Sequence, residues 1–259
     1  MPNEINRLYS YVLTYEGYFA PNPFENTCTL ACCKGQLRNA IPKYIIGNDA
    51  INQSESELLN RINELKDVNP NVIRNEKIWI IGLASIDGKL KKNNGDDVPG
   101  RSVIYIMQVT DILDYANYYT QYPQKRPIRV NEEDKNNYKY CGDNIYTPDG
   151  EMLISCHYND QNEENSQKHR DRDEQSRFVL LSDHFIYFGR NEAIELGEPD
   201  LLNDLSSGRN YKTHHTDMTL RNLEVLLNNS WGEYFALTHE NYEERYAYSA
   251  YLDYEPFVK

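Results

Sequence analysis

Two Ser-x-His pairs are the first candidates for chemistry in this sequence. Ser155 precedes His157 in one apolar run, and Ser182 precedes His184 in another. Because side chains alternate between the two faces of a strand, each serine would share a face with its histidine. Histidine exchanges a proton near neutral pH, which suits acid–base chemistry. A strand histidine is as often a structural residue, so that interpretation stays open beside the catalytic one.

Two turns carry further polar side chains. The segment from Glu16 to Phe24 contains one glycine and two prolines, which would hold Glu16 and Asn22 in a rigid loop. A second turn presents Asp143 and Asn144, although an Asp-Asn pair more commonly caps its own backbone. We predict that both turns and both histidine strands converge on one pocket. Hydrogen bonds to a shared ligand would satisfy all of these polar groups at once.

The cysteines favour a structural role. Their odd number, five, and the absence of a signal peptide after Met1 indicate free thiols and a cytoplasmic protein. Cys28 and Cys32 have a spacing that zinc sites use, but no second pair of ligands follows them. We predict no disulfide and no metal site, with Cys32 or Cys33 buried. A single reactive cysteine is the remaining alternative.

Composition limits the classes of function. The chain has 259 residues, 40 of them acidic and 27 basic, which gives a net charge of −13. This charge counts against binding to a long nucleic-acid duplex, which requires a basic face. No apolar run approaches the length of about 18 residues that a membrane span needs. The 22 tyrosines argue against disorder. Neither a cofactor nor an oligomeric state follows from these numbers.

The elements that must position these residues form a mixed pattern. Runs rich in β-branched and aromatic residues predict strands at Leu8–Tyr15, Ile78–Leu83, Ser102–Val109 and Phe178–Ser182. Trp79 lies within one of these runs and should be buried. The pattern lacks regular alternation of strands and helices, so it predicts an α+β fold. We expect a compact single domain over residues 1–259, with helices mainly in the C-terminal third.

Other segments have weaker or different signals. Lys43–Gly47 is a further strand candidate, and a capping box at Ser54 and Glu57 predicts a helix. Helical spacing also occurs at residues 111–120, 219–227 and 238–251. Residues 158–176 are almost entirely polar, which predicts a mobile loop.

A series of short motifs together resembles a known family, the second of the nucleotide modification associated domain families. In chain order the motifs are Tyr11–Tyr15, Phe19–Phe24, Cys28–Lys34, Ile104–Val109, Gly142–Tyr146, Ser155-x-His157 and Val179–Gly189. The resemblance spans nearly the whole chain. It implies an α+β domain of phage and bacterial proteins, encoded beside enzymes that alter nucleic-acid bases. A role in bacterial defence is a related implication.

The family pattern is not fully kept. Its motif Arg-x-x-Ala-x-x-Gly-Asp-Trp-Ile-x-Gly has two rival matches here, one beginning at Arg38 and the other at Arg74, and neither keeps the Gly-Asp. Residues 48–72 would be an insertion on one of these alignments. The run from Trp79 to Tyr119 is also similar to the small barrels of PUA and EVE domains, which hold a modified base. By that analogy we expect a mixed or antiparallel, barrel-like core.

Two hypotheses of different classes follow. In the first, the protein is an enzyme that acts on a nucleotide or modified base, with Asp143, His157 and His184 as acid–base groups. In the second, it is a non-catalytic reader that stacks a modified base on tyrosine rings. A regulatory partner from a phage or defence system is a weaker alternative. The candidate ligand-binding residues are Glu16, Asn22, Lys34, Arg38, Arg74, Asn144, Tyr146, Ser155, Ser182 and Tyr187.

Overall fold

The chain divides into two compact units in the computed structural model. Residues 1–16, 76–109 and 184–252 form the first unit, and residues 17–75, 110–183 and 253–259 form the second. The structure describes residues 4–13, 21–50, 52–86, 90–92, 94–127, 142–152, 163–190, 192–197, 199–205 and 210–228. Each unit has its own sheet. The expectation of one domain over the whole chain, with an insertion at 48–72, stays a prediction.

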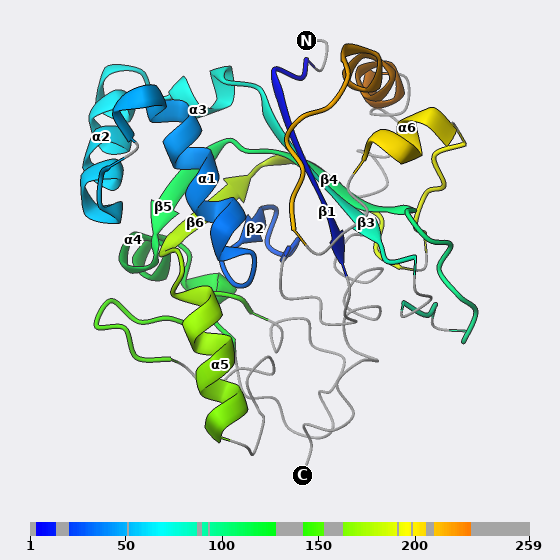
Figure 1. The fold of residues 1–259 in the computed structure, drawn as a ribbon. Coiled ribbons are helices and arrows are strands. Elements are labelled where there is room, and N and C mark those ends of the chain that lie inside the picture. Colours follow the sequence, from blue (N-terminus) through cyan, green and yellow to red (C-terminus); the bar gives the residue numbers. More distant parts are fainter. Residues whose placement is uncertain are drawn as a thin grey trace. The chain divides into compact units, whose positions relative to one another are not determined.

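The first unit is built on a mixed four-stranded sheet. Its strands are β1 (Arg7–Leu13), β3 (Ile78–Ala84), β4 (Val103–Gln108) and β7 (His184–Tyr187), in the order β1-β3-β4-β7 (Figure 1). β1 and β3 run parallel, and the other neighbours are antiparallel. Every residue of β3 is buried, which explains its continuous apolar sequence. Trp79 is fully buried as predicted, and its indole N–H donates to the Glu4 carbonyl at 2.8 Å.

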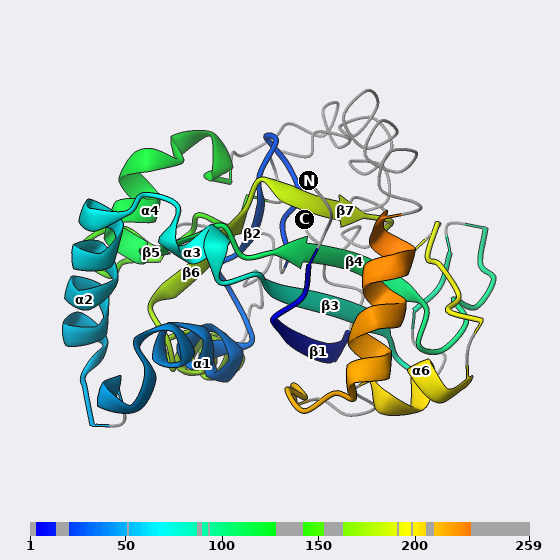
Figure 2. The same ribbon diagram turned by 90° about the horizontal axis from the view of Figure 1, so that it is seen from above.

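A helix at residues 217–228 packs on this sheet, as Figure 2 shows in orange. Leu223 and Leu227 of the helix join Ile81, Ile106 and Ile186 in one core cluster. The short helix α6 (Pro199–Asp204) precedes it in the chain. This C-terminal helix is close to the predicted one at 219–227. The helix predicted at 238–251 lies outside the described residues.

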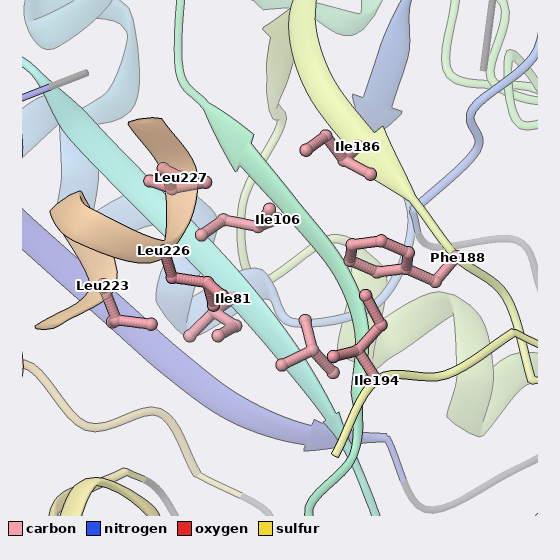
Figure 3. A pocket seen from close by; sticks show the side chains of 9 residues that line it. Ile81, Ile106, Ile186, Phe188, Ile194, Leu223, Leu226 and Leu227 are labelled. Carbon is pink, nitrogen blue, oxygen red and sulfur yellow. The ribbon is translucent and has the colours of Figure 1, made fainter. Parts of the chain in front are cut away.

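A small cavity lies between this helix and the sheet. Its volume is about 30 Å³, and apolar side chains line it (Figure 3). The lining residues are Ile81, Val103, Ile106, Ile186, Phe188, Ile194, Leu223, Leu226 and Leu227. These side chains offer no hydrogen bond to a phosphate or to the edge of a base.

The second unit combines an antiparallel sheet with several helices. The sheet order is β2-β6-β5, with β2 at Cys28–Leu30, β5 at Asp111–Asp114 and β6 at Phe178–Ser182. Its helices are α1 (Gly35–Ile46), α2 (Glu55–Val68), α3 (Val72–Asn75), α4 (Tyr115–Gln121) and α5 (Glu163–Asp173), with 3-10 turns η1 (Gly47–Ala50) and η2 (Pro123–Lys125). The α+β class is confirmed. In the described part of the chain both sheets are open, so the barrel expected by analogy does not form there.

Three predictions about elements were wrong. The helices are not concentrated in the C-terminal third, because α1, α2 and α3 lie in the first third of the chain. The run Lys43–Gly47 belongs to the end of α1 and the start of η1, since a short apolar run alone does not separate strand from helix. Residues 111–120 begin as strand β5 and become helix α4 only at Tyr115.

The polar segment predicted to be a mobile loop contains helix α5. Arg170 pairs with Glu174 at 2.8 Å, and Gln167 donates to Asp171 at 2.7 Å. Both pairs are four residues apart, the spacing at which side chains meet on a helix. A strongly polar composition is therefore compatible with an ordered helix here.

Helix α2 begins with the predicted capping box. The Glu57 N–H donates to the Ser54 hydroxyl at 3.4 Å, and the Ser54 N–H donates to the Glu57 carboxylate at 2.7 Å. We expect Ser54→Ala to lower the free energy of unfolding by about 1 kcal/mol, because it leaves an amide at the helix start without a partner. Urea unfolding measures this. Ser56→Ala on the exposed face of the same helix is the matched control and should change stability by less than about 0.5 kcal/mol.

Candidate functional site

Asp143 lies at the centre of a buried polar network in the second unit. Its carboxylate accepts hydrogen bonds from the Tyr118 hydroxyl at 2.6 Å and from the Thr29 hydroxyl at 2.7 Å. The residue is 1% exposed. Gly142 makes this position possible, because a β-carbon there would lie 2.4 Å from the Lys125 carbonyl oxygen. The turn at 142–144 thus packs directly on the backbone at 125–127.

Lys125 is the cation of the same network. Its Nζ donates to the backbone and side-chain oxygens of Asn22, both at 3.0 Å, to Thr29 Oγ1 at 3.3 Å, and to the Thr27 carbonyl. The Thr29 hydroxyl therefore joins Lys125 to Asp143. The loop around Asn22 is closed by mutual backbone bonds between Asn22 and Thr29 at 2.7 and 2.9 Å. Two predicted site residues, Asn22 and Asp143, are therefore connected through Lys125 and Thr29.

Burial moves the pKa values of both charged groups toward neutrality. It raises the pKa of Asp143 to about 6, although Lys125 and the bonds from Tyr118 and Thr29 act in the opposite direction. It lowers the pKa of Lys125 to about 8, against the attraction of Asp143. The pKa of Tyr118 is raised, first by burial and then by Asp143. An acid and a base that both titrate near neutral pH therefore share one network.

Sequence reasoning missed Lys125, Thr29 and Tyr118. Lys125 stands in a Pro-Gln-Lys-Arg-Pro segment, where a lysine normally faces water. Its partners lie about a hundred residues away along the chain, so no local pattern marks them. Only the fold brings these groups together.

Arg38 occupies a second buried network and is not available to a phosphate. Its guanidinium donates to the carbonyl oxygens of Cys33 at 2.8 Å, Asp173 at 2.7 Å, and Ser176 and Phe178 at 2.6 Å each. The side chain has no exposed surface. This geometry corrects the expectation that Arg38 is a phosphate ligand, because its donors are directed at backbone oxygens.

Arg74 is the more accessible arginine. It lies on α3 at the surface, and its Nη2 donates to both carboxylate oxygens of Asp183 at 2.5 Å. Lys34 is half-buried and precedes α1 with a left-handed backbone, φ 47°. Ser182 is buried on β6 opposite Cys28. Of the two rival arginines, only Arg74 is partly exposed, and its guanidinium forms an ion pair with Asp183.

A comparison with known families shows to which family the chain belongs. The sequence model described as nucleotide modification associated domain 2 matches residues 5–70 and 68–243. The chain belongs to this family. The matched residues include Asn22, Lys125 and Asp143, and the family's description associates the chain with nucleotide modification. No curated protein and no solved structure matches the chain.

In this nucleotide modification associated domain, two predicted residues lie in the first unit. His184 begins β7, is half-buried, and packs edge-on against Trp79 with 5.5 Å between ring centroids. Tyr187 is 3% exposed and stacks on Tyr105 at 6.2 Å. Tyr105 in turn donates its hydroxyl proton to Tyr11 at 2.7 Å. These tyrosine rings pack on each other within the core.

The remaining predicted site residues, Glu16, Ser155 and His157, lie outside the described residues. The convergence of two turns and two histidine strands on one pocket therefore stays a prediction. Within the described residues, Asn22 and Asp143 are connected through Lys125 and Thr29.

The described cysteines of the domain are Cys28, Cys32 and Cys33, all free thiols. Cys28 and Cys32 are buried, which confirms that one residue of the Cys32-Cys33 pair is buried. Burial raises the pKa of Cys33 to about 12, and that of Cys28 well above its usual range. These thiols are accordingly poor nucleophiles.

Within the described ranges, no group of three potential metal ligands comes together. Among the same residues, no helix is long and apolar enough to cross a bilayer.

Proposed function

We propose that the protein is an enzyme that acts on a nucleotide or a modified base, with Asp143 as an acid–base group. The observation that carries this proposal is the pairing of Asp143 and Lys125 in one network, with pKa values of about 6 and about 8. Charged groups are costly to bury, and pairs of groups shifted toward neutral pH are characteristic of sites that transfer protons. The family's description, which names nucleotide modification, supports a nucleotide or a base as the substrate.

A free nucleotide or nucleoside fits this protein better than a long duplex. The net charge of −13 would repel the densely charged backbone of double-stranded nucleic acid. A small ligand carries few charges and needs only a local basic contact. The basic groups that we assign to its phosphate are Lys34, just before α1, and Arg74, which would exchange its ion pair with Asp183 for the ligand.

The reader hypothesis receives less support from the tyrosines. A reader needs rings that are open to a flipped or free base. Tyr146 is 2% exposed and stacks on Tyr115 at 4.5 Å, and Tyr187 stacks on Tyr105. Both of these candidate rings thus stack on another tyrosine of the protein. The catalytic roles expected for His157 and His184 stay predictions.

The first experiment tests for a substrate and for chemistry on it. The purified protein is incubated with nucleotides and modified nucleosides; binding is followed by thermal shift and conversion by mass spectrometry. A ligand at about 100 times its dissociation constant should stabilise the protein by about 2.7 kcal/mol. We expect Asp143→Asn to retain the ligand-induced shift and to lose conversion by about 10²–10⁴-fold.

Asp49→Asn, at an exposed carboxylate of the same unit, is the matched control and should keep full conversion. Full conversion by Asp143→Asn would remove Asp143 from the chemistry. Binding without conversion by the unmodified protein, over the whole panel, would favour the reader.

A further inference from the structure

The hydrogen bonds of the buried Arg38 side chain connect it to Asp173 and Tyr115, which have further contacts of their own. The three guanidinium nitrogens hold together segments that are distant in the chain: Cys33 shortly before α1, Asp173 at the end of α5, and Phe178, the first residue of β6. The same guanidinium donates to the Tyr115 hydroxyl at 3.2 Å, and that hydroxyl contacts the Ala31 carbonyl at the same distance. Arg38 therefore fixes both Asp173 and Tyr115.

Asp173 and Tyr115 in turn hold a single residue, Tyr146. The Tyr146 hydroxyl donates to Asp173 Oδ2 at 3.1 Å, while Asp173 Oδ1 accepts the Cys33 N–H at 2.5 Å. The ring of Tyr146 lies nearly parallel to that of Tyr115, with 4.5 Å between centroids and 16° between planes. One hydrogen bond and one stacked ring thus help to hold Tyr146, which also forms a β-bridge with Met152.

Tyr146 ends the turn that carries Asp143. Between them, Asn144 donates from its side chain to the carbonyls of Tyr118 at 3.1 Å and Tyr122 at 2.9 Å, and its backbone N–H donates to Lys125 at 3.1 Å. These contacts hold the first half of the turn against α4 and η2. The second half is held at Tyr146. Asp143 is therefore placed from two directions.

We propose that Arg38 is a positioning residue for Asp143, acting through Asp173 and Tyr115 on Tyr146. The importance of this placement for catalysis rests on the proposed function, whereas the placement itself does not. The arrangement links α1 to the Asp143 turn by hydrogen bonds and one ring stack, each of which a substitution can remove. It also gives a physical reason for an arginine at this position, because a lysine cannot direct donors at several carbonyl oxygens in one plane.

Tyr146→Phe is the most selective test. It removes the bond to Asp173 and keeps the stacked ring, so the fold should survive. Burial is the main cause of the raised pKa of Asp143, and a displaced turn would admit water. We expect the pKa of the Asp143 carboxyl, followed by carbon NMR over a pH titration, to fall by about one unit. Arg38→Lys should produce a fall of at least the same size.

Tyr44→Phe, at an exposed tyrosine of α1, is the matched control and should leave the Asp143 titration unchanged. A Tyr146→Phe protein that is less stable but has an unchanged Asp143 titration would overturn the proposal, since Tyr146 would then be merely structural. This measurement needs no substrate. If no nucleotide is bound or converted, the proposed function fails while the positioning role is still decided by the titration.

Discussion

Replacing Lys125 with methionine should lower the free energy of unfolding by about 3–5 kcal/mol at pH 7. The substitution keeps the length of the side chain but removes the charge that faces Asp143 through Thr29. Asp143 then becomes a buried carboxylate without its cation, and the oxygens of Asn22 and Thr27 lose their donor. Urea unfolding of the full chain at pH 7 measures the loss.

The double variant Lys125→Met/Asp143→Asn separates the two causes of this loss. Neutral side chains in both positions leave no uncompensated charge, so the double variant should be more stable than Lys125→Met alone. Lys66→Met is the matched control, because Lys66 pairs with Asp111 at 2.6 Å in a partly exposed position. It should cost about 1 kcal/mol or less. A Lys125→Met cost no greater than this control would show that the buried network contributes little to stability.

The sequence allowed those parts of the fold to be predicted that have local signals. β3 was predicted because Ile78–Leu83 is a nearly continuous apolar run, and α2 because Ser54 and Glu57 have the spacing of a capping box. α1 was missed because its apolar residues follow one another closely at Tyr44-Ile45-Ile46, where helix and strand give the same pattern. Local signals thus decided which elements were predictable.

The candidate site was predictable only in part. Asn22 and Asp143 were singled out because a proline-flanked loop and an Asp-Asn turn are recognisable in sequence. Their connection depends on Lys125 and Thr29, and the bond from Lys125 to Asn22 spans 103 residues. Arg38 shows the converse error: a match to the arginine of the family motif suggested a phosphate ligand, yet backbone carbonyls from β6 and the end of α5 surround it. Contacts of this kind follow from the tertiary fold, which local patterns do not specify.

The contribution of Asp143 to the stability of the protein should fall as pH rises from about 4 to about 6, and Asp143→Asn should remove this contribution. The pKa of Asp143 is about 6 in the folded protein, above the ordinary value of 3.8. In this window the folded state holds a proton that the unfolded state has released, so raising the pH favours unfolding. A difference of about two pH units corresponds to about 3 kcal/mol. Lys125 has the opposite effect at higher pH: its folded pKa of about 8 lies below the ordinary 10.5, so stability should rise between these values.

Urea unfolding at pH 4, 5, 6 and 7 gives the difference in free energy between the unmodified protein and Asp143→Asn at each pH. Subtracting the two profiles removes contributions from the other carboxyl groups that both proteins share. Between pH 4 and pH 7, we expect the free energy of unfolding of Asp143→Asn to rise by about 3 kcal/mol relative to that of the unmodified protein. A difference that is constant with pH would mean that Asp143 titrates alike in the folded and unfolded states. It would then have neither the buried environment nor the near-neutral proton exchange on which its proposed role depends.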